Sequence, residues 1–517
     1  MRKVLLYICS VFILGGMTSC EDFLDKREDV GLTEDDIFRD YYSLRGFLDQ
    51  SFNQLENVMV MDNWENGRAF VGLFADEMAT TDNSSAVFTL HSGNWLSNAK
   101  SNKTFEIGNA GSTAISRSYK ALRINNRIIN DIDKAPLTPE QKNEILGQAY
   151  FYRSWFYFQI IKRYGGMPII DKVFEGGDDD IPRMTYHESH DWMMEDIQKA
   201  IYMLPDSWDD PNYGRPTKIA AMALKEWAQL FDASPLMQND LNSTENKGYD
   251  TERAKSAAKS AYEVIRYMDG SKSAPYPYGL ASKEEYTNVF YFKYPPVHQP
   301  EYIWVKRQFP NAANQNQKRT IRTFWQYEDL AFGSGPDGNS MCCPSLNIVN
   351  MFDKKGADGI YYPIDDPRSG YALDYDHKPF EDRDPRFYNN ILLPGTTWGH
   401  YADGRTYYIT TYKGGAAYQH MLTQKDCNKR MFTGFMCKKF MWPECNQYLE
   451  KNNPNCWWDY RFLTIYIRAS QIYLDYAEAL FEGCGSATAT IEGCPISAAE
   501  AINILRRRIG LTDLPSD

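Results

Sequence analysis

Residues 138–166 read TPEQKNEILGQAYFYRSWFYFQIIKRYGG, and this stretch has the signals of one long helix. Thr138 and Gln141 have the spacing of a capping box, and Pro139 suits the first helical position. Side chains that can form a buried stripe then recur at Ile145, Ala149, Tyr152 and Phe156. The pair Gly165-Gly166 is a typical stop signal. We therefore expect a helix that begins at Pro139 and ends before these glycines.

Other segments have the same periodicity and come in pairs. Thr33 and Asp36 can cap an early helix, and Ser497 with Glu500 forms another capping box near the end of the chain. The remaining helical stripes are those of Ile37, Tyr41, Leu44, Leu48 and Leu55; of Tyr119, Leu122, Asn126, Ile129 and Ile132; and of residues 187–203, 217–232, 251–268, 467–482 and 497–509. Helix pairs of this size must stack to bury their stripes, as tetratricopeptide units do.

Residues 271–465 differ in character, because Pro, Gly, Asn, Tyr and Trp replace the helical stripes. Short apolar runs such as Tyr302–Val305 and Tyr407–Thr411 predict brief strands within this irregular part. The predicted fold class is mostly α, with tetratricopeptide-like helical hairpins as a scaffold and a large loop-rich region that carries short strands. The predicted divisions are a helical part over 20–270, an irregular ligand-binding part over 271–465, and a closing helical pair over 466–517.

The first 19 residues read as an export signal. Basic Arg2 and Lys3 precede an apolar run from Val4 to Leu14 that is too short to span a bilayer. The residues Met17-Thr-Ser-Cys20 resemble a lipobox, which predicts that Cys20 carries a lipid anchor. The alternative is an ordinary secretory signal cleaved nearby. Acidic Glu21 and Asp22 follow the cysteine, as in the surface-export signal of some outer-membrane bacteria or in a solvated linker.

The charge balance of the chain limits the choice of partners. The formal net charge is −12, and removal of the leader with Arg2 and Lys3 makes it two units more negative. A protein this acidic has no electrostatic reason to meet nucleic acid. Aromatic residues make up 15% of the chain, so flat side chains are available for ligand contacts as well as for the core.

The cysteines and histidines give weak signals for bound metals. Eight cysteines follow Cys20, none in a C-x-x-C pair, and we expect Cys484 and Cys494 to staple the loop between them. His187 and His190 are three apart instead of the four that a metalloprotease needs, so a solvated helix start is expected there. The acidic run Asp178–Asp180 lacks the spaced oxygen ligands of a calcium loop. No metal and no cofactor are predicted.

Enzyme signatures are missing from the sequence, which contains neither a phosphate-binding loop nor a nucleophile elbow. A secreted glycoside hydrolase remains an alternative, because two carboxylates across a cleft would suffice for it. Asp384-Pro-Arg386 is predicted to be a rigid turn with an ion-paired arginine rather than a ligand contact.

Fragments spread along the whole chain resemble the SusD/RagB family of outer-membrane nutrient-binding lipoproteins. They occur in the family's order: Cys20–Asp25, Gly147–Arg153, Trp155–Phe158, Arg163–Pro168, Gly214–Lys218, Pro344-Ser345 with Met351–Asp353, Asp382–Phe387, Lys438-Lys439, Ile467-Arg468, Tyr473–Leu480 and Ala501–Asn503 to Arg508. The resemblance also implies a further segment rich in Glu, Arg and Trp, so the chain is expected to be a fragment or to lack that closing element.

The resemblance implies a function in nutrient uptake and no catalysis. We expect a surface-exposed lipoprotein of the outer membrane that captures oligosaccharides, as in polysaccharide utilization, and delivers them to a SusC-like TonB-dependent transporter. Peptides are the alternative ligands. A sugar site needs a flat aromatic face surrounded by hydrogen-bonding groups. The residues expected to provide it are Asp76, Trp95 and Asn98 in an early loop and Arg322, Trp325 and Tyr327 in a later one.

Overall fold

A computed structural model describes twelve segments of the chain. They are residues 33–55, 75–79, 114–174, 180–239, 247–273, 276–290, 298–307, 343–374, 378–400, 406–415, 433–439 and 463–515. The longest helix is α8 (Pro139–Tyr164), and it begins with the predicted capping box, since Thr138 Oγ1 accepts from the Gln141 N–H and Gln141 Oε1 accepts from the Thr138 N–H. It ends at Gly165, whose φ of 77° favours glycine. The prediction from residues 138–166 is confirmed.

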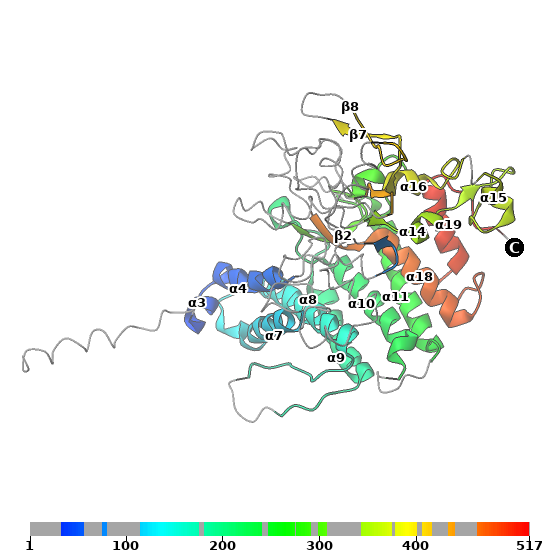
Figure 1. Cartoon of the computed structure of the whole chain (residues 1–517). Coiled ribbons are helices and arrows are strands. Elements are labelled where there is room, and N and C mark those ends of the chain that lie inside the picture. Colours follow the sequence, from blue (N-terminus) through cyan, green and yellow to red (C-terminus); the bar gives the residue numbers. More distant parts are fainter. Residues whose placement is uncertain are drawn as a thin grey trace, which may run out of the picture.

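The long helices form a row in which each packs against the next (Figure 1). Their bounds are α4 Tyr41–Gln54, α7 Ala114–Asp131, α8, α9 Tyr186–Met203, α10 Lys218–Ala233, α11 Thr251–Gly270, α18 Ala469–Cys484 and α19 Ala498–Arg508. Helix α18 packs on α11 although residues 271–468 separate them in sequence. This arrangement confirms the predicted scaffold of stacked helical hairpins.

The first predicted helix is in fact two helices, α3 (Glu34–Phe38) and α4. The predicted cap of Thr33 with Asp36 is present. Asp40 interrupts the stripe because its backbone is extended and its side chain accepts from the Ser43 N–H at 2.8 Å, which starts a new helix. At α19 only half of the predicted capping box forms. The Ser497 hydroxyl accepts from the Glu500 N–H, but the Glu500 carboxylate pairs with Arg507 instead of the Ser497 N–H.

Aromatic side chains fill the middle of the helical row. The indole ring of Trp304 lies 4.7 Å, centroid to centroid, from the rings of both Trp155 and Tyr466, and 4.8 Å from Phe151. Trp304 is only 2% exposed. Much of the unusual aromatic content therefore serves the core, where the edge-to-face contacts of these rings stabilise the packing.

Short strands form two-stranded antiparallel sheets, and all of the described strands except β1 lie between α11 and α18. The pairs are β2 Tyr302–Arg307 with β10 Leu463–Arg468, β1 Met78–Ala79 with β3 Cys343–Pro344, β4 Lys354–Lys355 with β5 Tyr361–Tyr362, β6 Ile391–Leu392 with β9 Met436–Cys437, and β7 Thr397–His400 with β8 Thr406–Tyr408. Short helices accompany them: α14 Leu346–Asn350, α15 Tyr371–Asp374 and α16 Pro385–Asn390. Single 3-10 turns cover Ile132–Lys134, Asp210–Asn212, Pro235–Met237, Ser271–Ser273, Thr287–Phe290 and Pro367–Ser369.

A buried glutamate connects this irregular part to the last helices. Glu301 is fully buried just before β2, and its carboxylate accepts from Arg508 Nη1 at 2.9 Å and from Ser470 Oγ at 2.6 Å. Arg468 lies 3.4 Å from the same carboxylate. Together with the β2–β10 pair, these bonds fix both ends of the irregular part to the helical row.

The expected turn at Asp384-Pro-Arg386 is also confirmed. Asp384 caps α16, and its carboxylate pairs with the guanidinium of Arg386 at 2.5 Å. The neighbouring Arg383 is 1% exposed and donates to the carbonyl oxygens of Val349 and Phe352. Arginine here holds loops together, so the motif has a structural role.

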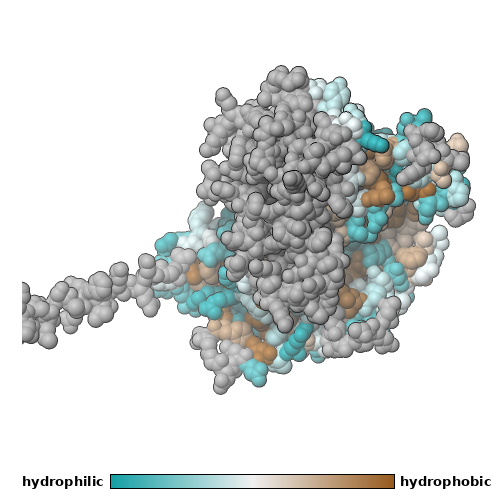
Figure 2. Space-filling model, viewed as in Figure 1, coloured by the Kyte–Doolittle hydropathy of each residue, from teal (hydrophilic) through white to brown (hydrophobic). Residues whose placement is uncertain are grey.

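The predicted staple between Cys484 and Cys494 is wrong, because both residues carry free thiols. Residues Cys427, Cys445 and Cys456 lie outside the described residues. Within the described segments, every helix is too short or too polar to cross a bilayer. On the face seen in Figure 2, hydrophilic residues are interspersed with apolar ones over the described helices.

Candidate functional site

One of the predicted ligand residues, Asp76, is described by the structure. It is exposed in the turn before β1, and the pairing of β1 with β3 brings this turn to the start of α14. Asn347 Nδ2 lies 3.4 Å from the Asp76 carboxylate, and the Ser345 hydroxyl donates to its carbonyl oxygen. Trp95, Asn98, Arg322, Trp325 and Tyr327 lie outside the described residues, as does Cys20. Their roles stay predictions.

A second place with a flat aromatic face lies where the α9–α10 connection meets β2. The ring of Tyr276 stacks on the imidazole of His298, with 3.7 Å between centroids and 20° between planes. Tyr213 meets the same imidazole edge-on at 4.8 Å. A narrow cavity of about 50 Å³ lies here, and Trp208, Tyr278 and Tyr302 also line it. The sequence analysis missed this site, because its rings come from three separate loops.

Polar groups surround these rings. Asp210 accepts from Tyr276 at 3.4 Å and lies 3.0 Å from His298 Nε2. Burial raises the pKa of the phenols of Tyr278 and Tyr302, and the Tyr302 hydroxyl donates to the Val289 carbonyl oxygen at 2.7 Å, so this group is used within the fold. The cavity is too small to enclose a sugar ring, so a sugar could only stack against the partly exposed ring of Tyr276 at its edge.

The arginine of the Gly214–Lys218 fragment stiffens the wall of this cavity. Arg215 donates to both carboxylate oxygens of Asp49, at 2.7 and 2.9 Å, and to Gln148 Oε1 at 3.0 Å. It therefore joins the loop before α10 to helices α4 and α8. Its guanidinium is used for structure rather than for a ligand.

Sequence comparisons place the chain in a known family. Residues 22–226 match a family model described as starch-binding and associating with the outer membrane, and residues 300–517 match the model of the SusD family. The two matches together span most of the chain. The chain belongs to the SusD/RagB family. None of the curated proteins matches it in sequence.

Solved structures of SusD-like proteins share the fold. A SusD-like protein of Bacteroides fragilis is 22% identical, with a TM-score of 0.66 over 94% of this chain and 82% of that one. A SusD-like carbohydrate-binding protein of the same species is 19% identical, with a TM-score of 0.63 over 93% and 80%. A structure with a xylogluco-oligosaccharide is 16% identical, with a TM-score of 0.56 over 90% and 76%.

Membership of the SusD/RagB family confirms the prediction of a binding protein rather than an enzyme. One pair of carboxyl groups in the described part of the chain lies close together. Glu226 and Asp475 interact, and burial raises the pKa of Glu226 well above its usual range and that of Asp475 to about 7. A hydrolase needs such a pair across an open cleft. Glu226, however, is 1% exposed inside the helical row, where a glycan has no access.

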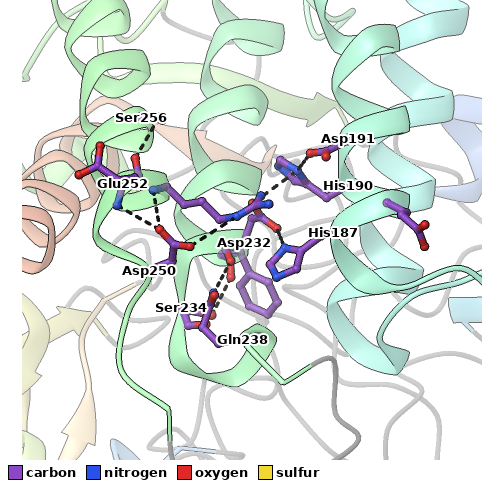
Figure 3. A network of polar contacts seen from close by, with 12 residues as sticks. His187, His190, Asp191, Asp232, Ser234, Gln238, Asp250, Glu252 and Ser256 are labelled. Atoms are coloured by element: carbon purple, nitrogen blue, oxygen red, sulfur yellow. Dashed lines mark hydrogen bonds and ion pairs between the residues drawn. The ribbon is translucent and has the colours of Figure 1, made fainter.

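The expectation of a solvated helix start at His187 and His190 is wrong. His190 is 4% exposed, and both imidazoles contact the buried carboxylate of Asp232 from helix α10 (Figure 3). The pattern within α9 alone did not indicate this partner, because Asp232 follows His190 by more than forty residues.

Proposed function

We propose that this SusD/RagB protein captures oligosaccharides at the outer membrane and delivers them to a SusC-like TonB-dependent transporter. The observation that carries the proposal is the match of residues 22–226 to a family described as starch-binding and associating with the outer membrane. Two of the structural neighbours are carbohydrate-related by description, one as a carbohydrate-binding protein and one with a xylogluco-oligosaccharide.

In this proposal the helical parts over 20–270 and 466–517 form the frame, and the ligand is held mainly by residues 271–465. Asp76, Trp95, Asn98, Arg322, Trp325 and Tyr327 contact the ligand, and Tyr276 offers a second aromatic face. Cys20 carries the lipid that keeps the protein at the cell surface. Hand-over to a transporter requires modest affinity, so we expect a Kd of about 1 µM, near −8 kcal/mol.

Binding is tested with a panel of polysaccharides and oligosaccharides, using calorimetry on the protein without its leader. Trp95→Ala and Trp325→Ala should each weaken binding by at least about tenfold, because an aromatic platform contributes more than about 1 kcal/mol. Their melting temperatures should change little. Trp304→Ala is the core control, and it should cost about 3–5 kcal/mol of stability.

The alternatives give different results in the same experiments. Binding of peptides but not of glycans would assign the protein to peptide uptake. New reducing ends released from a polysaccharide would contradict a purely binding role. If Tyr276→Ala abolishes binding while the tryptophan variants do not, the ligand is held at the Tyr276 cavity instead.

The anchor and the partner need tests in cells. Cys20→Ser should release the protein from the membrane fraction while leaving glycan affinity unchanged. The wild-type protein should co-purify with a TonB-dependent transporter from detergent extracts. Failure of that co-purification in a strain that grows on the bound glycan would contradict delivery to such a transporter.

A further inference from the structure

The turn of Asp76 is fixed against helix α14 by bonds between distant parts of the chain. Strand β1, which follows the turn, pairs with β3, which precedes the helix. The Ser345 N–H donates to the Glu77 carbonyl oxygen at 2.9 Å. The Ser345 hydroxyl donates to the Asp76 carbonyl oxygen and accepts from the Ile348 N–H at 3.3 Å as the cap of α14. One serine therefore holds both the turn and the start of the helix, so their side chains keep a defined relation.

The Asp76 carboxylate meets the side chain of Asn347 at the surface. Asn347 Nδ2 donates to Asp76 Oδ2 at 3.4 Å, and both residues are exposed. A carboxylate can accept about four hydrogen bonds, and an asparagine amide has a second N–H and a carbonyl oxygen. The pair therefore keeps acceptors and a donor that a ligand can reach from solvent.

Apolar side chains border this pair. Leu346 is 54% exposed and Met351 is 69% exposed. Met351 follows Asn347 by four residues and keeps helical backbone angles, so the two side chains lie on the same face of α14. Exposed apolar groups beside hydrogen-bonding groups suit a sugar, because its ring has C–H faces and a rim of hydroxyl groups.

The charges of the turn favour a neutral sugar over an acidic one. Glu77 follows Asp76 and is also exposed. Among the described residues, no cation lies within 4 Å of either carboxylate, although the charge of Lys439 interacts with Glu77 over a longer distance. A carboxylate on the ligand would be repelled here, whereas hydroxyl groups can donate to Asp76 in charge-assisted hydrogen bonds.

We propose that Asn347 is a sugar-contacting residue that acts as a pair with Asp76 and selects neutral over acidic oligosaccharides. Asp76 accepts hydrogen bonds from ligand hydroxyl groups. Asn347 orients that carboxylate and accepts a further hydroxyl at Oδ1, and Met351 contacts a C–H face. The inference rests on the proposed function, because it completes the part of the ligand site to which Asp76 was assigned there.

The test is calorimetry on the full chain without its leader. Maltohexaose, laminarihexaose and a xyloglucan oligosaccharide are the neutral probes, and hexagalacturonate is the acidic one. At least one neutral probe should bind, and hexagalacturonate should bind at least about tenfold more weakly. Asn347→Ala should weaken binding of the neutral probe by about threefold to tenfold, the range of one hydrogen bond. Asn143→Ala, at an exposed asparagine of α8, is the matched control and should change nothing.

Two further measurements separate a role in binding from a role in the fold. Asp76→Asn keeps the size of the side chain but removes its charge, so the preference for the neutral probe over hexagalacturonate should fall by about tenfold. Asp76→Ala combined with Asn347→Ala should lose less affinity than the two single variants added together, since the groups act as one pair. Melting temperatures should stay unchanged, because both side chains are exposed.

Several results would overturn the inference. They are equal affinities of wild type and Asn347→Ala, additive losses in the double variant, or hexagalacturonate binding as tight as that of the neutral probes. If Trp95→Ala and Trp325→Ala abolish binding while the Asn347 and Asp76 variants leave it intact, the proposed glycan capture stands and this inference alone fails. Binding of none of the probes would count against both.

Discussion

Removal of Asp196 should destabilise the helical row more than removal of any exposed charge. Arg153 on α8 is 5% exposed, and its Nε and Nη2 donate to the two Asp196 oxygens at 2.6 and 2.8 Å. Its Nη1 donates to Asn126 Oδ1 on α7 at 3.0 Å. One guanidinium therefore joins three successive helices. Among the described residues, Asp196 is its only buried acidic partner.

The expected size of the effect follows from the burial of the pair. Asp196→Ala leaves the guanidinium of Arg153 without a counter-charge away from water, which costs about 3–5 kcal/mol. Replacing both residues by apolar ones of similar volume is often nearly neutral, so Arg153→Met combined with Asp196→Leu should lose less than Asp196→Ala alone. Exposed Asp133, paired with Lys142, is the control, and Asp133→Ala should change stability little.

The measurement is a double-mutant cycle of Arg153→Met, Asp196→Leu and their combination, with Asp196→Ala beside it, from urea and thermal unfolding at neutral pH. Strong coupling between positions 153 and 196 is expected. If the double variant loses the sum of the two single losses, the pair contributes no coupled interaction and the reasoning fails. An effect of Asp133→Ala as large as that of Asp196→Ala would also contradict it.

Two further predictions concern pH and glycine. Because burial raises the pKa of Asp475 from 3.8 to about 7, its stabilising contribution is complete below about pH 4 and is lost as the pH rises through 7. Asp475→Asn should therefore flatten the fall in melting temperature between pH 5 and 8, and an unchanged slope would count against it. A Cβ at Gly166 would lie 2.1 Å from the Met184 carbonyl oxygen, so Gly166→Ala should cost about 1–3 kcal/mol. A Cβ at Gly46, inside helix α4, would meet nothing within 4 Å, so Gly46→Ala should stabilise the protein by about 0.5–1 kcal/mol. If both glycine variants shift the melting temperature in the same direction, these two predictions are refuted.

Signals within one helix were readable from the sequence. The cap at Thr138, the stop at Gly165 and the buried stripe between them depend on residues within a few turns of each other, so local spacing determines them. The same holds for the turn at Asp384, where Arg386 pairs with a carboxylate two residues away. Where a partner lies close in sequence, pattern and structure agree.

Partners from different helices were not readable. Arg153 pairs with Asp196, and His190 approaches Asp232, across more than forty residues in each case. Periodicity indicates which face of a helix is buried, but it does not say which polar side chain of the next helix will meet it. The two histidines were therefore expected in solvent, and the salt bridge of α8 was not expected at all.

The candidate ligand residues depend neither on signals within one helix nor on pairs between neighbouring helices. Asp76 lies in the turn before β1, and the strand that pairs with β1, β3, follows Asp76 by more than 260 residues. The Tyr276 ring stacks on a histidine from another loop. Loop positions like these depend on long-range contacts that no spacing rule encodes. Family resemblance is what named Asp76, and chemistry alone would have chosen among many aromatic and acidic residues.

The way in which the irregular part is attached explains how one frame can carry different ligand loops. Helix α11 packs directly against α18, so the helical row is continuous although residues 271–468 lie between these two helices in sequence. The strands β2 and β10 pair where the irregular part begins and ends, and the Glu301 carboxylate binds Arg508 and Ser470 at the same place. Some loop residues beyond this junction also bond to the helical frame, because Arg506 of α19, which is 7% exposed, donates to the Asp353 carboxylate at 2.8 Å. Substitutions at Glu301 and at Asp353 should therefore lower the stability of the frame, whereas exposed loop positions without such bonds can vary with the ligand.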